Sequence, residues 1–175
     1  MLYPWYETVD SSNVIFQGDL IPECPIVKPP DNLELDTMPE VEIQRFNSIV
    51  VSQSCDLEND KIEIVLVCPY LTLSEYLSQL PENYQNADGR KNVKKALKQG
   101  HYPSNHLLNK DEQSGLSDFI VVDFRNVYGV SFDYLKKYVY KIPKRIRLLP
   151  PYREHLSQAF ARFFMRVGLP SNIDI

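Results

Sequence analysis

One thiol lies among small polar residues, directly after an apolar run that is typical of a buried strand. The run is Ile49-Val50-Val51, and the residues after it are Ser52, Gln53, Ser54, Cys55 and Asp56. A second apolar run covers residues 62–68, and Thr72 follows it. The ends of strands often present reactive or binding groups. We therefore expect the two strands to bring Cys55, Asp56 and Thr72 to one rim.

The polar side chains of this segment suit binding. Ser52, Gln53, Ser54 and Asp56 donate or accept hydrogen bonds, as recognition of a phosphate, a base edge or a peptide backbone requires. Two alternatives stay open. Serine and glutamine side chains also satisfy the backbone amides of a turn, and aspartate commonly starts one.

Cys55 is also a candidate nucleophile, although an incidental thiol fits the sequence as well. A catalytic thiol needs a base or a positive environment to form the thiolate, and the only histidines are His101, His106 and His155. The histidines and cysteines form no closely spaced pair of zinc ligands. The sequence also lacks nucleotide-binding glycine loops and the HExxH and GxSxG motifs. We therefore expect no metal and no cofactor.

The charges are distributed unevenly along the chain. Residues 1–63 contain thirteen acidic and three basic side chains, a net charge of −10. Residues 134–168 carry about +8, with Arg145, Arg147 and Arg153 among their nine basic side chains. One interpretation is a surface that binds a polyanion such as single-stranded RNA. The other is that the acidic and basic segments pair across the fold.

Length and composition indicate a single domain over residues 1–175. No apolar run approaches the ~20 residues of a membrane-spanning helix, and the N-terminus lacks the basic start and apolar core of a signal peptide. The three cysteines are odd in number and widely spaced, as in proteins with free thiols. We expect a cytoplasmic protein without membrane contact.

Hydrophobic periodicity predicts an α+β fold with a small, strongly bent, antiparallel, barrel-like sheet. We expect strands over residues 14–16, 20–21, 41–51, 62–68, 119–124 and 144–149. We expect a long amphipathic C-terminal helix and three shorter helices, over residues 151–168, 73–80, 90–99 and 131–140. The proline-rich segment 22–40 is predicted to be a loop or an extended edge segment. The sheet core would comprise residues 14–72 and 118–149, with a helical insertion over 73–100 and a packing helix over 151–168.

The order of three short motifs resembles the MazF/PemK-type toxins. The motifs are Gly18-Asp19, Ile49-Val50-Val51-Ser52, and the segment from Val65 to Thr72 with Cys68-Pro69 inside it. This resemblance, over residues 14–72, implies a small SH3-like barrel that cleaves RNA without metal. It also implies that Arg45 and Thr72 act on the scissile phosphate, where a base and a cation are needed. The Ser-Gln-Ser-Cys-Asp-Leu segment and the C-terminal segment 153–170 further resemble uncharacterised bacterial proteins of similar length.

Two differences from the toxin family decide between the functional hypotheses. Arg45 lies several residues before the family position and lacks the Arg-Pro pair, and Thr72 lies one residue after it. We therefore favour a non-catalytic binding or regulatory subunit of a bacterial defence or toxin–antitoxin-like system. Its expected partner is a protein from the same operon or a nucleic acid, and it could form an oligomer. The alternatives are a metal-independent endoribonuclease of the MazF/PemK type and a cysteine-dependent enzyme.

Overall fold

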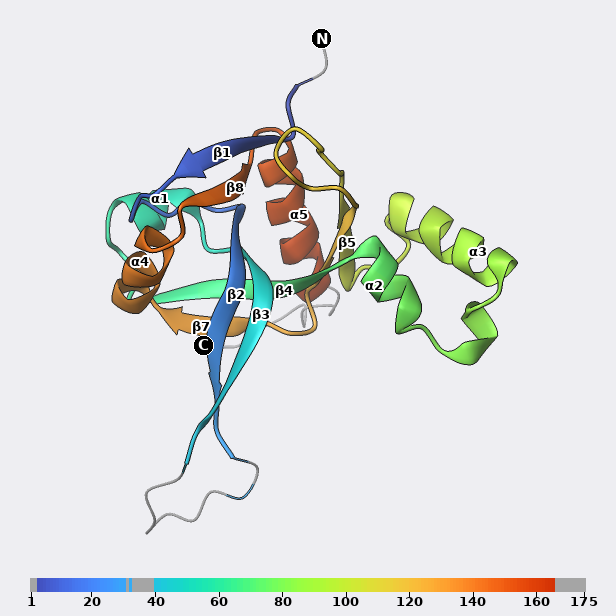
Figure 1. The fold of residues 1–175 in the computed structure, drawn as a ribbon, viewed down its shortest axis with the longest axis horizontal. Helices are drawn as coiled ribbons and strands as arrows, with labels where there is room; N and C mark the ends of the chain where they lie inside the picture. Colours follow the sequence, from blue (N-terminus) through green and yellow to red (C-terminus); the bar gives the residue numbers. More distant parts are fainter. Residues whose placement is uncertain (1–2, 31, 33–39, 166–175) are drawn as a thin grey trace, which may run out of the picture.

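The computed structural model describes residues 3–30, 32 and 40–165, which form an α+β fold around an antiparallel sheet (Figure 1). Within these residues the sheet has eight strands in the order β1-β8-β2-β3-β4-β6-β5, and β7 pairs with β4 beside that path. The strands are β1 (Tyr6–Asp10), β2 (Asp19–Lys28), β3 (Glu42–Val50), β4 (Ile64–Thr72), β5 (Asn105–Leu108), β6 (Ile120–Asp123), β7 (Tyr128–Ser131) and β8 (Lys144–Leu148). The predicted α+β class is confirmed.

The sheet is open. β1 and β5 stand at opposite ends of the strand order, and in the described part of the chain each of them pairs with one neighbour, β8 and β6 respectively. A closed barrel would pair its two end strands with each other. The prediction of a barrel-like sheet is therefore wrong in its closure.

Helices cover both faces of the central strands. One hydrophobic cluster joins Val50 to α4 (Phe132–Tyr140), and another joins Ile49 and Val51 to α5 (Tyr152–Phe164). Side chains alternate between the two faces along a strand. Burial on both faces therefore explains why the apolar run is continuous rather than alternating.

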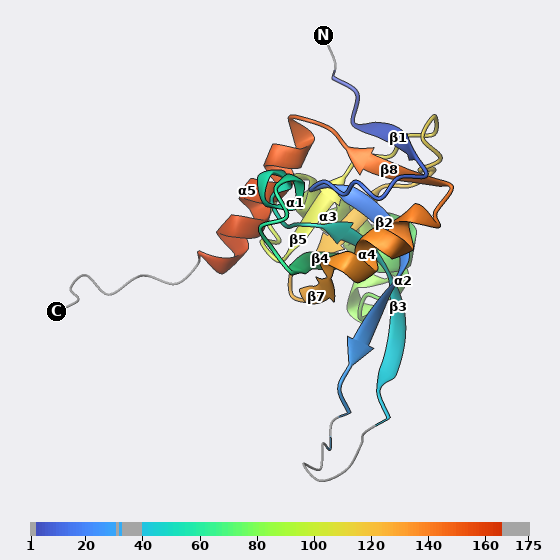
Figure 2. The ribbon, with the colours of Figure 1, turned by 90° about the vertical axis from the view of Figure 1, so that its left-hand side faces the viewer.

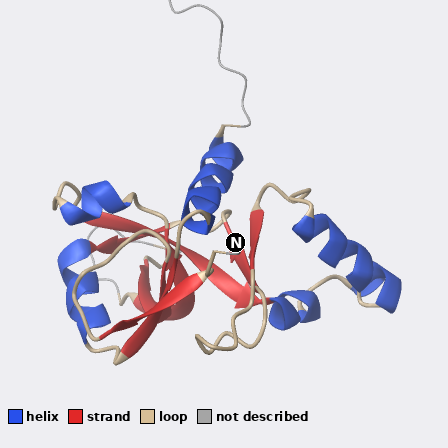
Figure 3. Ribbon diagram, turned by 90° about the horizontal axis from the view of Figure 1, so that it is seen from above, coloured by secondary structure: helices blue, strands red, loops and turns tan. Residues whose placement is uncertain are grey.

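Helices occupy the segment in which the sequence predicts a helical insertion. α2 (Leu73–Ser78) and α3 (Ala87–Lys98), joined by a 3₁₀ turn (Glu82–Tyr84), form a lobe that lies apart from the other helices when seen from above (Figure 3). The lobe has a small core of its own, in which leucine and valine side chains of both helices pack against Val121 of β6.

β2 runs through Pro22 and Pro25, where the sequence predicts a loop or an extended edge segment, and the structure has the second of these alternatives. The strand pairs with β8 only at Asp19 and Leu20, and beyond them β3 is its one neighbour among the described residues. An edge strand tolerates proline because one of its sides is unpaired. The outer parts of β2 and β3 extend from the sheet as a two-stranded ribbon (Figure 2). Residues 31 and 33–39 of the predicted loop lie outside the described residues.

The pairing of β3 with β4 decides which predicted site residues meet. The two strands are antiparallel, with Val50 opposite Val67. The polar segment that follows β3 therefore lies beside the beginning of β4, whereas Thr72 lies at the far end of β4. The prediction that Cys55, Asp56 and Thr72 share one rim is wrong, because antiparallel strands end at opposite ends of their ladder.

The other predicted elements agree with the structure apart from their ends and the shortest segments. The predictions over 41–51, 62–68, 119–124, 144–149, 131–140 and 151–168 correspond to β3, β4, β6, β8, α4 and α5. The described part of α5 ends at Phe164, and the predicted end at Gly168 lies outside the described residues. Residues 14–16 form no strand. The sequence analysis missed β1, β5, β7 and the five-residue helix α1 (Ser54–Glu58).

Candidate functional site

α5 is the element on which the candidate site is built. Its apolar stripe, formed by Leu156, Phe160 and Phe163, packs into the core beside Phe124. The rings of Phe124 and Phe160 meet edge to face, with 5.4 Å between their centroids. Because a helix turns once in 3.6 residues, the side chains outside this stripe form two polar flanks. A cavity lies along each flank.

The first flank faces α1, and the α1–α5 cavity between them has a volume of about 490 Å³. Its lining residues are mostly polar: Gln17, Gln53, Ser54, Cys55, Glu58, Arg153, Glu154, Ser157 and Gln158. The side-chain amide of Gln53 donates to the Ser157 hydroxyl at 3.0 Å and so links the two walls. The structure thus brings together four predicted site residues, namely Gln53, Ser54, Cys55 and Arg153.

The two serines of the segment hold its backbone in place. The Ser52 hydroxyl accepts a hydrogen bond from the backbone N–H of Leu66 at 2.8 Å. The Ser54 hydroxyl accepts one from the backbone N–H of Gln17 at 3.2 Å, and the buried Gln17 amide donates to Val51 O at 2.9 Å. The alternative in which these hydroxyls satisfy backbone amides is therefore confirmed. Gln53 is left to face α5.

Cys55 is the exposed thiol of the cavity, whereas Cys24 and Cys68 are buried. Burial raises the pKa of both buried thiols to about 12, so they stay protonated. The Cys55 Sγ lies 3.8 Å from a carboxylate oxygen of Asp56. A catalytic thiol needs a base beside it, and the described residues that line the cavity include no histidine to accept its proton.

Thr72 serves as the N-cap of α2. Its hydroxyl accepts a hydrogen bond from the backbone N–H of Glu75 at 3.2 Å and donates to the Glu75 carboxylate at 2.8 Å. That carboxylate also accepts from the backbone N–H of Thr72 at 2.8 Å, which completes a capping box. Arg45 is exposed on β3, and its Nη1 lies 3.5 Å from Glu23 O.

Arg145 and Arg147 lie on β8 and bind the same carboxylate. Arg145 Nε and Arg147 Nη2 both lie 3.0 Å from Asp19 Oδ2. The side chains of Asp19 and Arg145 are fully buried, and that of Arg147 is 12% exposed and stacks over the ring of Phe16. These two arginines therefore have a structural role and do not reach the α1–α5 cavity.

Pairing of this kind accounts for part of the uneven charge distribution. Lys136 of the basic segment binds Asp60 of the acidic segment at 3.0 Å, and Arg153 Nη2 binds the neighbouring Glu154 at 2.8 Å. The Arg153–Glu154 pair lies within the basic segment, but the Lys136–Asp60 pair and the ion pairs of Asp19 support the interpretation that the acidic and basic segments neutralise each other across the fold.

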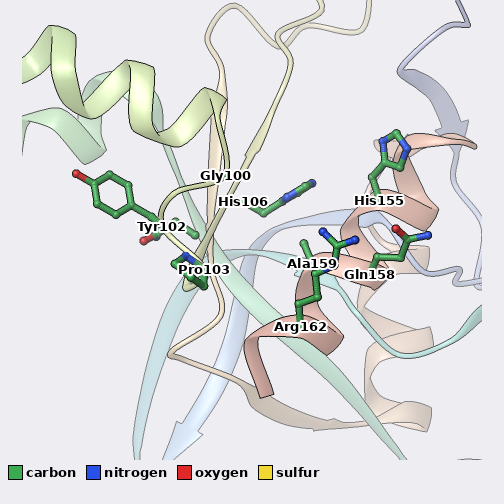
Figure 4. A pocket seen from close by; sticks show the side chains of 9 residues that line it. Gly100, Tyr102, Pro103, His106, His155, Gln158, Ala159 and Arg162 are labelled. Carbon is green, nitrogen blue, oxygen red and sulfur yellow. The ribbon is translucent and has the colours of Figure 1, made fainter. Parts of the chain in front are cut away.

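The second flank of α5 faces the segment that leads into β5. Here lies a cavity of about 540 Å³, lined by Gly100, Tyr102, Pro103, Asn105, His106, His155, Gln158, Ala159 and Arg162 (Figure 4). We call it the histidine cavity. The sequence analysis named its two histidines only as possible partners of Cys55. Their separation of almost fifty residues leaves no local signal that they meet.

Comparison with known proteins finds no family model and no curated protein that matches the chain. The functional proposal therefore depends on the site alone. Over residues 3–30, 32 and 40–165, no group of three or more histidine, cysteine, aspartate and glutamate side chains is arranged to hold a metal ion. None of the helices in that part of the chain has the length and apolar character to span a membrane.

Proposed function

We propose that this protein is a non-catalytic binding subunit, part of a bacterial defence or toxin–antitoxin-like system, which holds a segment of a partner protein in the α1–α5 cavity. One observation carries the proposal: Gln53, Ser54, Cys55 and Arg153 converge on one open polar cavity. Arg45 and Thr72, the groups that cleavage would need, lie elsewhere.

The chemistry of the cavity suits a peptide backbone. Gln53, Ser157 and Gln158 offer both donors and acceptors. Glu154 Oε2 is buried and has no hydrogen-bond partner among the described residues, which is unfavourable. A hydrogen-bond donor from a bound segment would satisfy this acceptor. An extended chain supplies donors and acceptors in alternation, which matches this lining better than an apolar ligand does.

Cross-linking from Cys55 tests the proposal. Of the three cysteines only Cys55 is exposed, so a photoreactive maleimide attaches to it alone in the folded protein. The matched control carries the same group on α3, in the double variant Cys55→Ser, Gln99→Cys, because Gln99 is exposed and far from the cavity in the sequence and fold. We expect the Cys55 probe to capture the product of a neighbouring gene in host cells and the Gln99 probe to miss it. Equal capture from both positions, or capture from neither, would overturn the proposal.

A metal-independent endoribonuclease of the MazF/PemK type is the second candidate, and one observation favours it. Ser48 lies opposite Pro69, and extending this antiparallel register puts Arg45 level with Thr72. The strands have separated there, since β4 turns to pair with β6, but both side chains belong to the same end of the ladder. Incubation with long single-stranded RNA in EDTA tests this candidate. Cleavage that is lost in Arg45→Ala would establish it, and intact RNA at high protein concentration would exclude it.

A cysteine-dependent enzyme is the third candidate, and the geometry supports it least. An activated thiol reacts with iodoacetamide faster than free cysteine does at neutral pH. With Asp56 beside Cys55 and no imidazole on the cavity wall, we expect a rate no faster than that of free cysteine. A rate about tenfold faster would restore this candidate.

A further inference from the structure

The histidine cavity lies on the flank of α5 next to the α1–α5 cavity, and Gln158 lines both cavities. His155, Gln158 and Arg162 come from α5, and His106 comes from β5. Figure 4 shows the His106 ring and the Arg162 guanidinium turned toward one another across the cavity, while His155 and Gln158 project from the neighbouring turns of α5. Positions 155, 158 and 162 lie three and four residues apart and so share one side of the helix.

The lining of this cavity is basic. It contains one guanidinium, two imidazoles and two amides, and no aspartate or glutamate. Arg162 makes no hydrogen bond or ion pair with residues 3–30, 32 or 40–165, unlike Arg145 and Arg147. The two imidazoles and the two amides beside it on the cavity wall can donate hydrogen bonds, which is what a small anion requires.

Asn105 contributes an unsatisfied hydrogen-bond donor to the lining of the histidine cavity. Its side-chain Nδ2 is buried and has no acceptor among the described residues, although the Ser104 hydroxyl donates to its Oδ1 at 3.0 Å. A buried donor without an acceptor is unfavourable. An anion in the cavity that Asn105 lines would supply acceptor atoms.

Burial favours the neutral form of the His106 imidazole. Burial, and after it the nearby His155, lower the pKa of His106 to about 4. The ring of Phe124 stacks beside the His106 ring, with 6.2 Å between their centroids. The nearby carboxylate of Asp123 in β6 forms its ion pair with Arg125 and not with His106. Arg162 is therefore the one permanently charged group on the wall of this cavity.

We propose that the histidine cavity binds a phosphate group, with Arg162 as its permanent charge and His106, His155, Gln158 and Asn105 as hydrogen-bond donors. Phosphate is the common group of a free nucleotide and of a nucleic-acid backbone, and the cavity recognises that group. The site shares only Gln158 with the α1–α5 cavity, and the proposal goes beyond the proposed partner binding.

The proposal has a definite dependence on pH. A bound dianion favours the protonated imidazole and so raises the pKa of His106 from its low value. Binding of the dianion then takes up a proton at His106, so the affinity counted per dianion, after correction for the protonation of phosphate itself near pH ~6, rises as the pH falls from 8 to 5.5. A site that used Arg162 alone would lack this increase, because arginine keeps its charge throughout that range.

Titration with inorganic phosphate, followed by NMR of the histidine ring protons, tests the site directly. The chain has three histidines, and His101 is exposed and does not line the cavity, so it serves as an internal reference. We expect saturable shifts of His106 and His155 with little shift of His101. Arg162→Gln should weaken phosphate binding about tenfold or more, while the matched variant Arg90→Gln, at an exposed arginine that lines neither cavity, should change it less than about twofold.

Two further ligands identify the source of the phosphate group. A mononucleotide that binds more tightly than phosphate, with the same dependence on Arg162, assigns the site to free nucleotides. If only a short oligouridylate, and not the mononucleotide, binds more tightly than inorganic phosphate, the site is assigned to a nucleic-acid backbone. Absent shifts of His106 and His155, equal shifts of all three histidines, or binding that Arg162→Gln leaves unchanged would each overturn the proposal.

Discussion

Asp19 and Arg145 form an ion pair in which both side chains are fully buried, with 3.0 Å between Asp19 Oδ2 and Arg145 Nε. Asp19 belongs to the acidic first third of the chain, and Arg145 to the basic last third. Arg147 binds the same carboxylate from the edge of the core. This ion pair therefore links β2 to β8 at the place where the backbones of the two strands are also paired.

Replacing the buried carboxylate should be strongly destabilising. Asp19→Asn removes the charge that compensates the fully buried guanidinium of Arg145. Breaking one side of a buried pair costs about 3–5 kcal/mol, and urea unfolding at pH 7 measures this loss. Asp133→Asn is the control, since Asp133 pairs with Lys136 at 3.4 Å on the surface and its side chain is 85% exposed. We expect a loss of at most about 1 kcal/mol there. Equal losses in both variants would contradict this account.

Gly18 should tolerate no side chain. Its φ of +87° lies in the region that favours glycine, and an added Cβ would meet Leu148 Cβ at 2.9 Å and Leu148 O at 3.3 Å. Gly18→Ala should therefore cost about 2–4 kcal/mol, from backbone strain and overpacking together. Gly100→Ala separates the two causes, because Gly100 also has a positive φ of +68° but nothing lies within 4 Å of an added Cβ. That variant should cost about 1 kcal/mol. Thermal or urea unfolding of both variants gives the comparison.

Thr72 should behave as a helix cap. Thr72→Ala removes the hydroxyl that accepts from Glu75 N, and it should lower the free energy of unfolding by about 1 kcal/mol. Thr72→Ser keeps that acceptor and should stay within about 0.5 kcal/mol of the original protein. If the RNA assay detects cleavage, Thr72→Ser decides between the roles: a cleavage rate that falls at unchanged stability would assign Thr72 to the chemistry.

His106 should make the fold less stable in mild acid. Its pKa is about 4 in the folded protein and near 6.5 in the unfolded chain, so the unfolded chain binds more protons between these values. Stability therefore rises with pH through this window and is lost as the pH falls from about 6.5 toward 4. In phosphate-free buffer, His106→Gln should lose about 2 kcal/mol less than the original protein between pH 7 and 4.5. His101→Gln, at an exposed position, should match the original protein.

Local patterns predicted the larger elements of this fold but not how they pair. The continuous apolar run at Val50 correctly indicates a strand covered on both faces. Pro22 and Pro25 leave a loop and an extended edge segment both open, because an edge strand accommodates proline and only the strand order reveals the edge. The same limit applies to the rim predicted for Thr72, since the direction of β4 relative to β3 is a property of the pairing.

For the candidate site too, the sequence predicts individual residues but not which of them come together. Gln53 and Arg153 were both predicted as binding residues, but their convergence depends on how α5 packs, and no spacing in the sequence encodes it. For the same reason, nothing in the sequence indicates that His106 and His155 line one cavity. The charge pattern pointed to Arg145 as a surface group, yet burial beside Asp19 makes it part of the core.

The most direct test of the central claim is the alkylation rate of Cys55 with and without the partner that its cross-linker captures. Cys55 lines the α1–α5 cavity, so a partner segment seated there must shield the thiol from iodoacetamide. We predict a rate at least about tenfold slower at saturating partner, with the original rate restored when the partner segment is deleted. An unchanged rate in the fully formed complex would contradict the claim, because the partner would then bind elsewhere on the molecule.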